Sequence, residues 1–150
     1  MSKNDSFSIE ERKEYAINAV NLSKKTKVDS VIIRSNRNLA YLYINIDYYD
    51  TFKDINLETI DLASKINDSI SIAYSYHNLG WYYQLEEKPD SAYYYYYNVR
   101  KLYNRFNDGR NEGEVLLNMA YIQKAEKDYV GAETNLIEAL KLIENEPKSV

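Results

Sequence analysis

Three asparagines recur at intervals of forty residues, and a large aromatic residue follows each of them three positions later. The asparagines are Asn38, Asn78 and Asn118, and the aromatic residues are Tyr41, Trp81 and Tyr121. An amide side chain offers two donors and an acceptor, which matches the pairing needs of an extended polypeptide backbone. Large aromatic side chains anchor apolar groups at binding surfaces. The two rows therefore indicate a surface that holds a peptide or a protein partner.

Neighbouring positions extend this surface, because residues three, four and seven apart share one face of a helix. The predicted binding face comprises Arg34, Asn38, Tyr41, Tyr74, His77, Asn78, Trp81, Glu114, Asn118 and Tyr121. It runs from the basic Arg34 and Arg37 to the acidic Glu112 and Glu114, and such a charge gradient can fix the direction of a partner. An alternative is that the asparagines bond between neighbouring helices while the aromatic residues cover exposed core.

The residue types that enzymes use are scarce. His77 is the only histidine, cysteine is missing from the sequence, and no glycine-rich phosphate loop is present. We therefore expect no enzyme activity, no metal site and no cofactor. The formal net charge of −4 argues against a nucleic acid partner, which would require clustered basic residues.

Two further features concern the membrane and the compartment. No run of about 18 apolar residues is present, so we expect no direct membrane insertion. The polar stretch 1–8 lacks the apolar segment of a signal peptide. The chain is therefore expected to be cytoplasmic if Met1 is native, and its compartment is unknown if it is an excised domain.

A forty-residue repeat positions the binding face. The triplet Asn38-Leu39-Ala40 matches Asn78-Leu79-Gly80 and Asn118-Met119-Ala120, and only two prolines and four glycines interrupt the sequence. Each repeat is predicted to be two helices, with Asp29, Asp50, Ser69 and Asp90 as N-terminal caps. The expected fold is all-α, a right-handed α-solenoid of antiparallel helix pairs with about seven helices. Its single domain, 1–150, divides into an unpaired helix, 8–25, and the repeats 29–66, 69–106 and 110–144.

Small and aromatic residues indicate how the helices pack. Gly80 would weaken the middle of a helix by about 1 kcal/mol relative to alanine, so a close helix crossing is predicted there. The five successive tyrosines 93–97 must point around the whole helix, since adjacent residues cannot share one face. Tyr93 and Tyr96 are expected to face inward.

The repeat resembles the tetratricopeptide repeat (TPR) family, through Asn78-Leu79-Gly80, Tyr83, Ala92, Tyr96 and Val99, with further matches at Ala120, Ala132, Leu136 and Ala139. The resemblance implies a scaffold for protein or peptide binding. The long repeat is similar to that of TPR sensing regions in bacterial regulatory proteins. Some TPR domains clamp a terminal carboxylate with asparagines and basic residues. Arg34, Asn38 and Asn78 match that pattern, whereas Glu114 would repel the carboxylate, so such a clamp is not expected.

The ends of the chain leave a second function open. The last helix keeps the apolar Leu136, Leu140 and Ile143, although a solenoid normally closes with a polar face. We expect the chain to be a segment of a longer repeat array. The alternative is a structural or dimerisation arm, which associates as a homo-oligomer through the solenoid ends or through the tyrosine-rich convex face.

Overall fold

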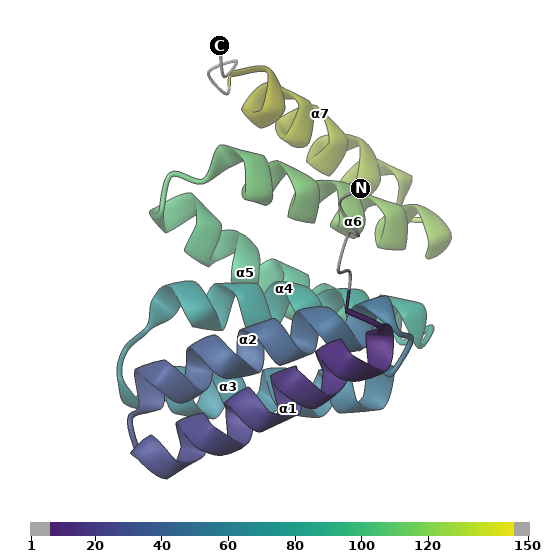
Figure 1. The fold of residues 1–150 in the computed structure, drawn as a ribbon. Helices are drawn as coiled ribbons and strands as arrows, with labels where there is room; N and C mark the ends of the chain where they lie inside the picture. Colours follow the sequence, from purple (N-terminus) through teal and green to yellow (C-terminus); the bar gives the residue numbers. More distant parts are fainter. Residues whose placement is uncertain (1–6, 146–150) are drawn as a thin grey trace, which may run out of the picture. The chain divides into compact units, whose positions relative to one another are not determined.

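The computed structural model describes residues 7–145, and all the regular structure in that range is helical (Figure 1). The helices are α1 (Ile9–Thr26), α2 (Asp29–Asn45), α3 (Tyr49–Lys65), α4 (Ser69–Leu85), α5 (Pro89–Arg105), α6 (Gly109–Ala125) and α7 (Tyr129–Asn145). Each helix begins twenty residues after the one before it. Because the sequence repeats every forty residues, every second helix is equivalent in sequence. We call α2, α4 and α6 first-type helices and the others second-type helices. The prediction of an all-α helical repeat is confirmed.

Two compact units make up the chain. Unit 1 is Met1–Ile72 and unit 2 is Ala73–Val150, so the division falls inside α4. In unit 1, α2 packs against both α1 and α3. In unit 2, α6 packs against both α5 and α7. Each unit therefore contains a first-type helix enclosed by two second-type helices.

The turns between helices share one backbone conformation. The residue that ends each helical run has a positive φ and is never a glycine; these residues are Lys27, Asp47, Asn67, Glu87, Asn107 and Lys127. In the five turns after α2, α3, α4, α5 and α6, the next backbone N–H bonds to a carbonyl five residues back, as from Asp108 to Tyr103 at 3.0 Å and from Asp128 to Gln123 at 2.8 Å. This is the Schellman arrangement, which satisfies the free carbonyls of a helix end. The turn between α1 and α2 differs, because the Val28 N–H bonds to the Thr26 hydroxyl at 3.2 Å instead.

The helix caps differ from the prediction. Asp68, Asp108 and Asp128 accept the backbone N–H of the residue three positions ahead, at 3.0, 3.1 and 3.0 Å. These aspartates directly follow the positive-φ residue and directly precede the first helical residue, the position from which a side chain can cap the helix. The predicted caps Asp29, Asp50, Ser69 and Asp90 instead lie inside the first helical turn. The three aspartates there still favour the positive end of the helix dipole.

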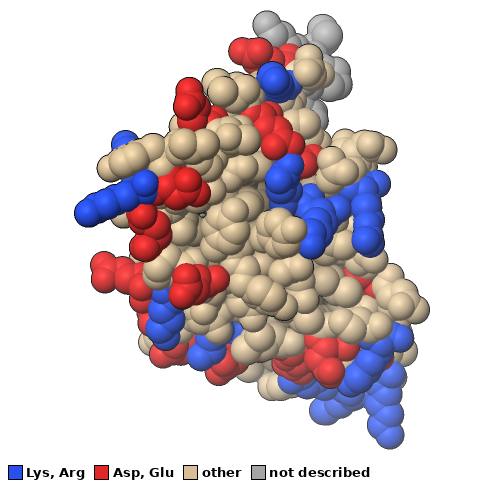
Figure 2. All heavy atoms as spheres, turned by 180° about the vertical axis from the view of Figure 1, so that it is seen from behind, with Lys and Arg blue, Asp and Glu red and all other residues tan. Residues whose placement is uncertain are grey.

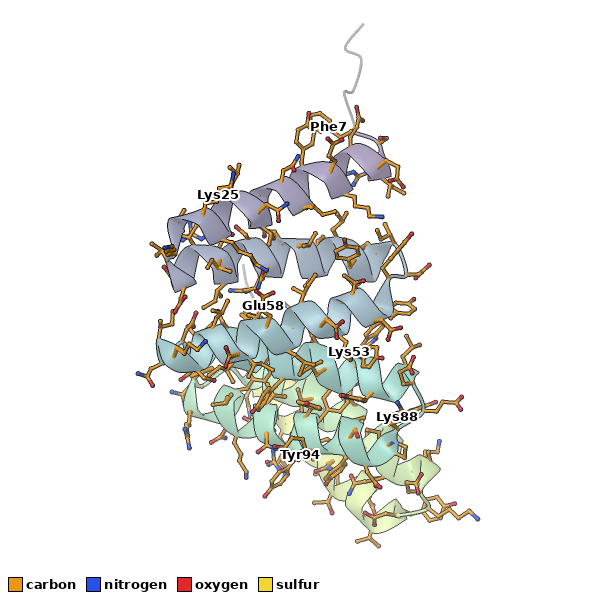
Figure 3. All side chains as sticks on the ribbon, turned by 90° about the horizontal axis from the view of Figure 1, so that it is seen from below. Phe7, Lys25, Lys53, Glu58, Lys88 and Tyr94 are labelled. Atoms are coloured by element: carbon orange, nitrogen blue, oxygen red, sulfur yellow. The ribbon has the colours of Figure 1, made fainter. Side chains whose placement is uncertain are left out.

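Gly80 confirms the close approach that the sequence predicts. A Cβ atom at Gly80 would lie 2.6 Å from the Tyr96 ring, and both residues are buried. Tyr96 is the fully buried member of the tyrosine run, whereas Tyr93 is only partly buried against the core of unit 2. Tyr94 is 57% exposed at the outer side of α5 (Figure 3). The run is therefore divided between core and surface, as expected.

Within residues 7–145, no helix combines the length and the apolar character that crossing a membrane demands. The stretch from which the compartment is inferred, 1–8, lies mostly outside the described residues.

Candidate binding face

In unit 1, the predicted binding residues share the exposed side of α2. Arg34 and Asn38 are exposed, and Tyr41 is 73% exposed. The opposite side of the same helix buries Ile33 and Leu39 in the core of the unit. Alternation of this kind follows from helical periodicity, because core residues fix the direction of the remaining ones. Unit 1 therefore presents a basic, an amide and an aromatic side chain to solvent from one helix.

In unit 2, α6 presents the equivalent set. Tyr121 is 66% exposed, Glu114 is exposed and Asn118 is half-buried. Glu114 forms an intrahelical ion pair with Arg110, with 3.9 Å between Oε1 and Nε. Val115 and Met119 occupy the buried side of α6. On α6, Glu114 and Tyr121 are thus accessible to solvent, and Asn118 is partly so.

Trp81 of α4 is less accessible than its counterparts Tyr41 and Tyr121, which are both exposed. Tyr74 is 39% exposed, while Asn78 and Trp81 are half-buried. Each of these three side chains has an interaction partner within the chain. The α4 residues of the predicted binding face therefore also make contacts within the chain.

His77 is directed toward α5 within unit 2. Its Nδ1 lies 3.1 Å from the Tyr103 hydroxyl, and its ring meets the rings of Tyr96 and Tyr103 edge to face. Burial lowers the pKa of His77, and the charge of Glu114 opposes that shift. Glu114 of α6 is thus close enough to His77 of α4 for its charge to influence the pKa of the imidazole. His77 therefore lies behind the face as a packing residue, next to Asn78 in the chain.

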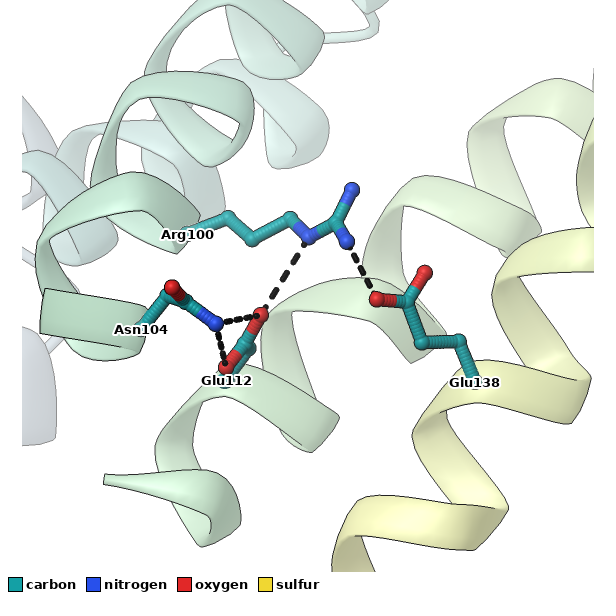
Figure 4. A network of polar contacts seen from close by, with 4 residues as sticks. All are labelled: Arg100, Asn104, Glu112 and Glu138. Carbon is teal, nitrogen blue, oxygen red and sulfur yellow. Dashed lines mark hydrogen bonds and ion pairs between the residues drawn. The ribbon is translucent and has the colours of Figure 1, made fainter. Parts of the chain in front are cut away.

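Glu112 does not belong to the acidic end of the face. It is only 3% exposed, and both of its carboxylate oxygens are hydrogen-bonded (Figure 4). The Asn104 amide donates to Oε2 at 3.2 Å, and Arg100 Nε lies 3.4 Å from Oε1. Arg100 also pairs with Glu138 of α7 at 2.5 Å. The expectation that Glu112 lines the binding face is wrong, since it joins α6 to α5.

This polar network was missed by sequence reasoning, although a signal for it exists. Arg100 stands at the repeat position that Ile60 and Leu140 occupy in the other second-type helices. A charged residue at an otherwise apolar repeat position requires a partner. The candidates for that partner are the acids that follow in the sequence, Asp108, Glu112 and Glu114.

Comparison with known proteins finds a match in fold to solved structures. The chain matches no protein-family model and no curated protein sequence. Its fold is similar to the crystal structure of BtubC (BKLC) from P. vanneervenii, with a TM-score of 0.79 and 17% sequence identity. The match covers 95% of this chain and 62% of that chain. At this identity the similarity establishes the helical-repeat fold alone.

Proposed function

We propose that the protein is a scaffold that binds a peptide or a segment of another protein on the exposed face of its first-type helices. The observation that carries this proposal is the exposure of Tyr41, 73%, and Tyr121, 66%, at equivalent positions of two helices. The core does not require aromatic residues there, because both rings lie on the side opposite the buried residues. Exposed aromatic residues at recurring positions are typical of binding surfaces.

The asparagines support the same proposal. Asn38 and Asn118 precede the exposed tyrosines by three residues, so the amide and the ring lie on one side of each helix. An amide can pair with the backbone of an extended chain while the neighbouring ring contacts its side chains. This division of roles accommodates an extended segment of another polypeptide.

We further propose that the chain is the sensing arm of a bacterial regulator. The resemblance to TPR proteins supports this more specific role. No reaction is assigned to the chain, since its single histidine is engaged with Tyr103 in unit 2. Glu114 continues to argue against a terminal-carboxylate clamp, because its charge is exposed on α6.

A peptide-selection experiment tests the proposal. Peptides would be selected from a random display library against the whole chain, and their affinity for Tyr121→Ala would then be measured by titration calorimetry. Loss of the ring should weaken binding by about 2 kcal/mol, as at other aromatic anchors. Tyr94→Ala is the matched control, because Tyr94 is similarly exposed but lies on α5. Equal affinities of both variants and the parent chain would refute the proposed face.

A second candidate function, self-association, is favoured by the outer side of α7. Leu136 is 43% exposed, whereas the equivalent Tyr96 and Asn56 are 0% and 2% exposed. Ile143 is 41% exposed, whereas the equivalent Tyr103 is 2% exposed. Positions that neighbouring helices cover elsewhere in the repeat are thus open on α7.

Charge complementarity suggests a second copy of the chain as the occupant of this side. Glu133 and Lys141 lie four residues before and four residues after Ile137, and neither has an ion-pair partner among residues 7–145. An antiparallel pairing of two α7 helices about a twofold axis at Ile137 would place each Lys141 against the Glu133 of the other copy. Sedimentation at low and high protein concentration should reveal a dimer.

Charge exchange distinguishes this dimer from other associations. Glu133→Lys and Lys141→Glu should each weaken the dimer, because each places like charges together. The double exchange should restore it. A monomer at high concentration, or a dimer insensitive to all three variants, would exclude self-association through α7.

A further inference from the structure

A basic hollow lies along α5, where Glu112 of α6 meets it. It has a volume of about 410 Å³ and is lined by Tyr97, Arg100, Lys101, Asn104, Arg105 and Glu112. Three cationic side chains therefore lie around one hollow, although the formal net charge of the chain is −4. Figure 2 shows that basic side chains do gather in groups on the face in view.

The repeat provides an internal comparison for these cations. The positions of Arg100, Lys101 and Arg105 are occupied by Ile60, Asp61 and Lys65 in α3, and by Leu140, Lys141 and Asn145 in α7. In α3 the pair is neutral, because Lys65 Nζ bonds to Asp61 at 2.7 Å. In α5 the same spacing brings Lys101 and Arg105 together, and like charges four residues apart weaken a helix. The two cations therefore repel one another in the folded chain.

The cations keep donors that no carboxylate occupies. Arg105 has no acidic partner in the part of the chain that the structure describes, and Lys101 Nζ contacts only the Tyr97 ring, at 4.1 Å from its centroid. Arg100 uses Nε and one terminal nitrogen for Glu112 and Glu138, which leaves the other terminal nitrogen without a carboxylate (Figure 4).

Contacts with carboxylates hold two of the side chains that line the hollow, Arg100 and Asn104. The Arg100 side chain is only 28% exposed, and its position is fixed by carboxylates from α6 and α7. Asn104 is held by Glu112, whose carboxylate accepts hydrogen bonds from both Asn104 and Arg100. Preorganised donors bind an anion at a smaller entropic cost than mobile surface side chains do.

We propose that this hollow binds an acidic segment of a protein partner, with at least two carboxylates meeting Arg105, Lys101 and the remaining donor of Arg100. Arginine pairs with carboxylates through a planar fork, and the Tyr97 ring offers an apolar contact beside it. A nucleic acid would require a longer track of cations along its phosphates. None of the residues involved belongs to the face of the first-type helices, so this inference does not depend on the proposed function.

Fluorescein-labelled hexaglutamate is the probe for this site, with hexaglutamine as the uncharged control. Binding to the whole chain would be followed by fluorescence polarisation. Hexaglutamate should bind, hexaglutamine should not, and the affinity should fall as salt is added. In Lys101→Gln/Arg105→Gln the affinity should fall by about tenfold or more, because two charge-assisted contacts are lost.

Lys25→Gln/Lys65→Gln is the matched control, since it makes the same charge change at the positions of α1 and α3 that are equivalent to Arg105. It should bind hexaglutamate within about twofold of the parent chain, because screening limits the effect of distant charges. Equal losses in the two double variants, or no binding by the parent chain, would overturn the inference. Tighter binding of a single-stranded oligothymidylate that responds to the same variants would also overturn it, in favour of a nucleic acid ligand.

Discussion

Asn36 is a residue whose environment conflicts with its chemistry. Its side chain is 1% exposed, and neither its amide nitrogen nor its oxygen has a hydrogen-bond partner. The other buried asparagines differ, since Asn56 donates to the Phe52 carbonyl and Asn135 donates to Gln123. A buried polar group without a partner retains its full desolvation cost. Leu116, at the equivalent position of α6, is fully buried without that cost.

Asn36→Leu should therefore stabilise the protein. The gain in unfolding free energy should be about 1 to 3 kcal/mol, the cost of an unsatisfied buried polar group. Urea unfolding followed by circular dichroism would measure it. Asn36→Ala is the control, because it removes the amide but leaves a cavity and should gain less. A loss of stability in Asn36→Leu would show that the amide makes a contact that the fold needs.

His77 is a residue that makes stability depend on pH. Its pKa is lowered by burial, so the folded protein takes up the imidazole proton at lower pH than the unfolded chain does, whose pKa is about 6.5. Below that pH the unfolded state binds more protons, and stability falls as the pH falls. The pKa values of Glu11 and Asp68 are also lowered. Carboxylates titrate near pH 4, so these two groups change the stability only at more acidic pH.

We expect the unfolding free energy to decrease between pH of about 7 and about 5, and His77→Gln to remove most of that slope. Urea unfolding at several pH values checks this. A slope that persists unchanged in His77→Gln would assign the pH dependence to other groups.

At the scale of the helix, the sequence predicted that each helix is present more accurately than it predicted the residues at which the helices begin. The forty-residue match of Asn-Leu-Ala with Asn-Leu-Gly and Asn-Met-Ala was enough to place all the helices, because repeated core residues imply repeated geometry. The caps were misplaced because the positive-φ turn residues are not glycines. Without glycine, the sequence lacks the usual marker that separates the end of one helix from the cap of the next.

Gly80 gives the prediction at this scale. In Gly80→Ala the new methyl group would meet the Tyr96 ring, whose position is fixed by burial and by a hydrogen bond from its hydroxyl to Gln84. Overpacking should lower the unfolding free energy by about 1 to 3 kcal/mol and outweigh the better helix propensity of alanine, worth about 1 kcal/mol.

Ala120→Gly is the complementary change on α6, where alanine already fits. It should cost about 1 kcal/mol through helix propensity alone. Thermal unfolding of both variants tests the two effects. A more stable Gly80→Ala would mean that α4 and α5 do not approach closely at this point.

At the scale of the whole molecule, the fold class followed from the repeat, whereas the detailed sites followed only in part. Tyr41, Glu114 and Tyr121 lie on exposed helix faces as spacing predicted. His77 and Glu112 could not be placed in the same way, because their positions depend on partners in other helices, Tyr103 and Arg100. Residue spacing predicts which side of its own helix a residue lies on, but it does not predict which residues of a neighbouring helix that residue contacts.

The most direct test of the account is an NMR map of a library-selected peptide bound to the whole chain. Binding on the first-type helices should shift the side-chain amide signals of Asn78 and Asn118 and the indole N–H signal of Trp81, since those groups would meet the peptide. Shifts confined to α5 or α7, with these three signals unchanged, would contradict the proposed binding face.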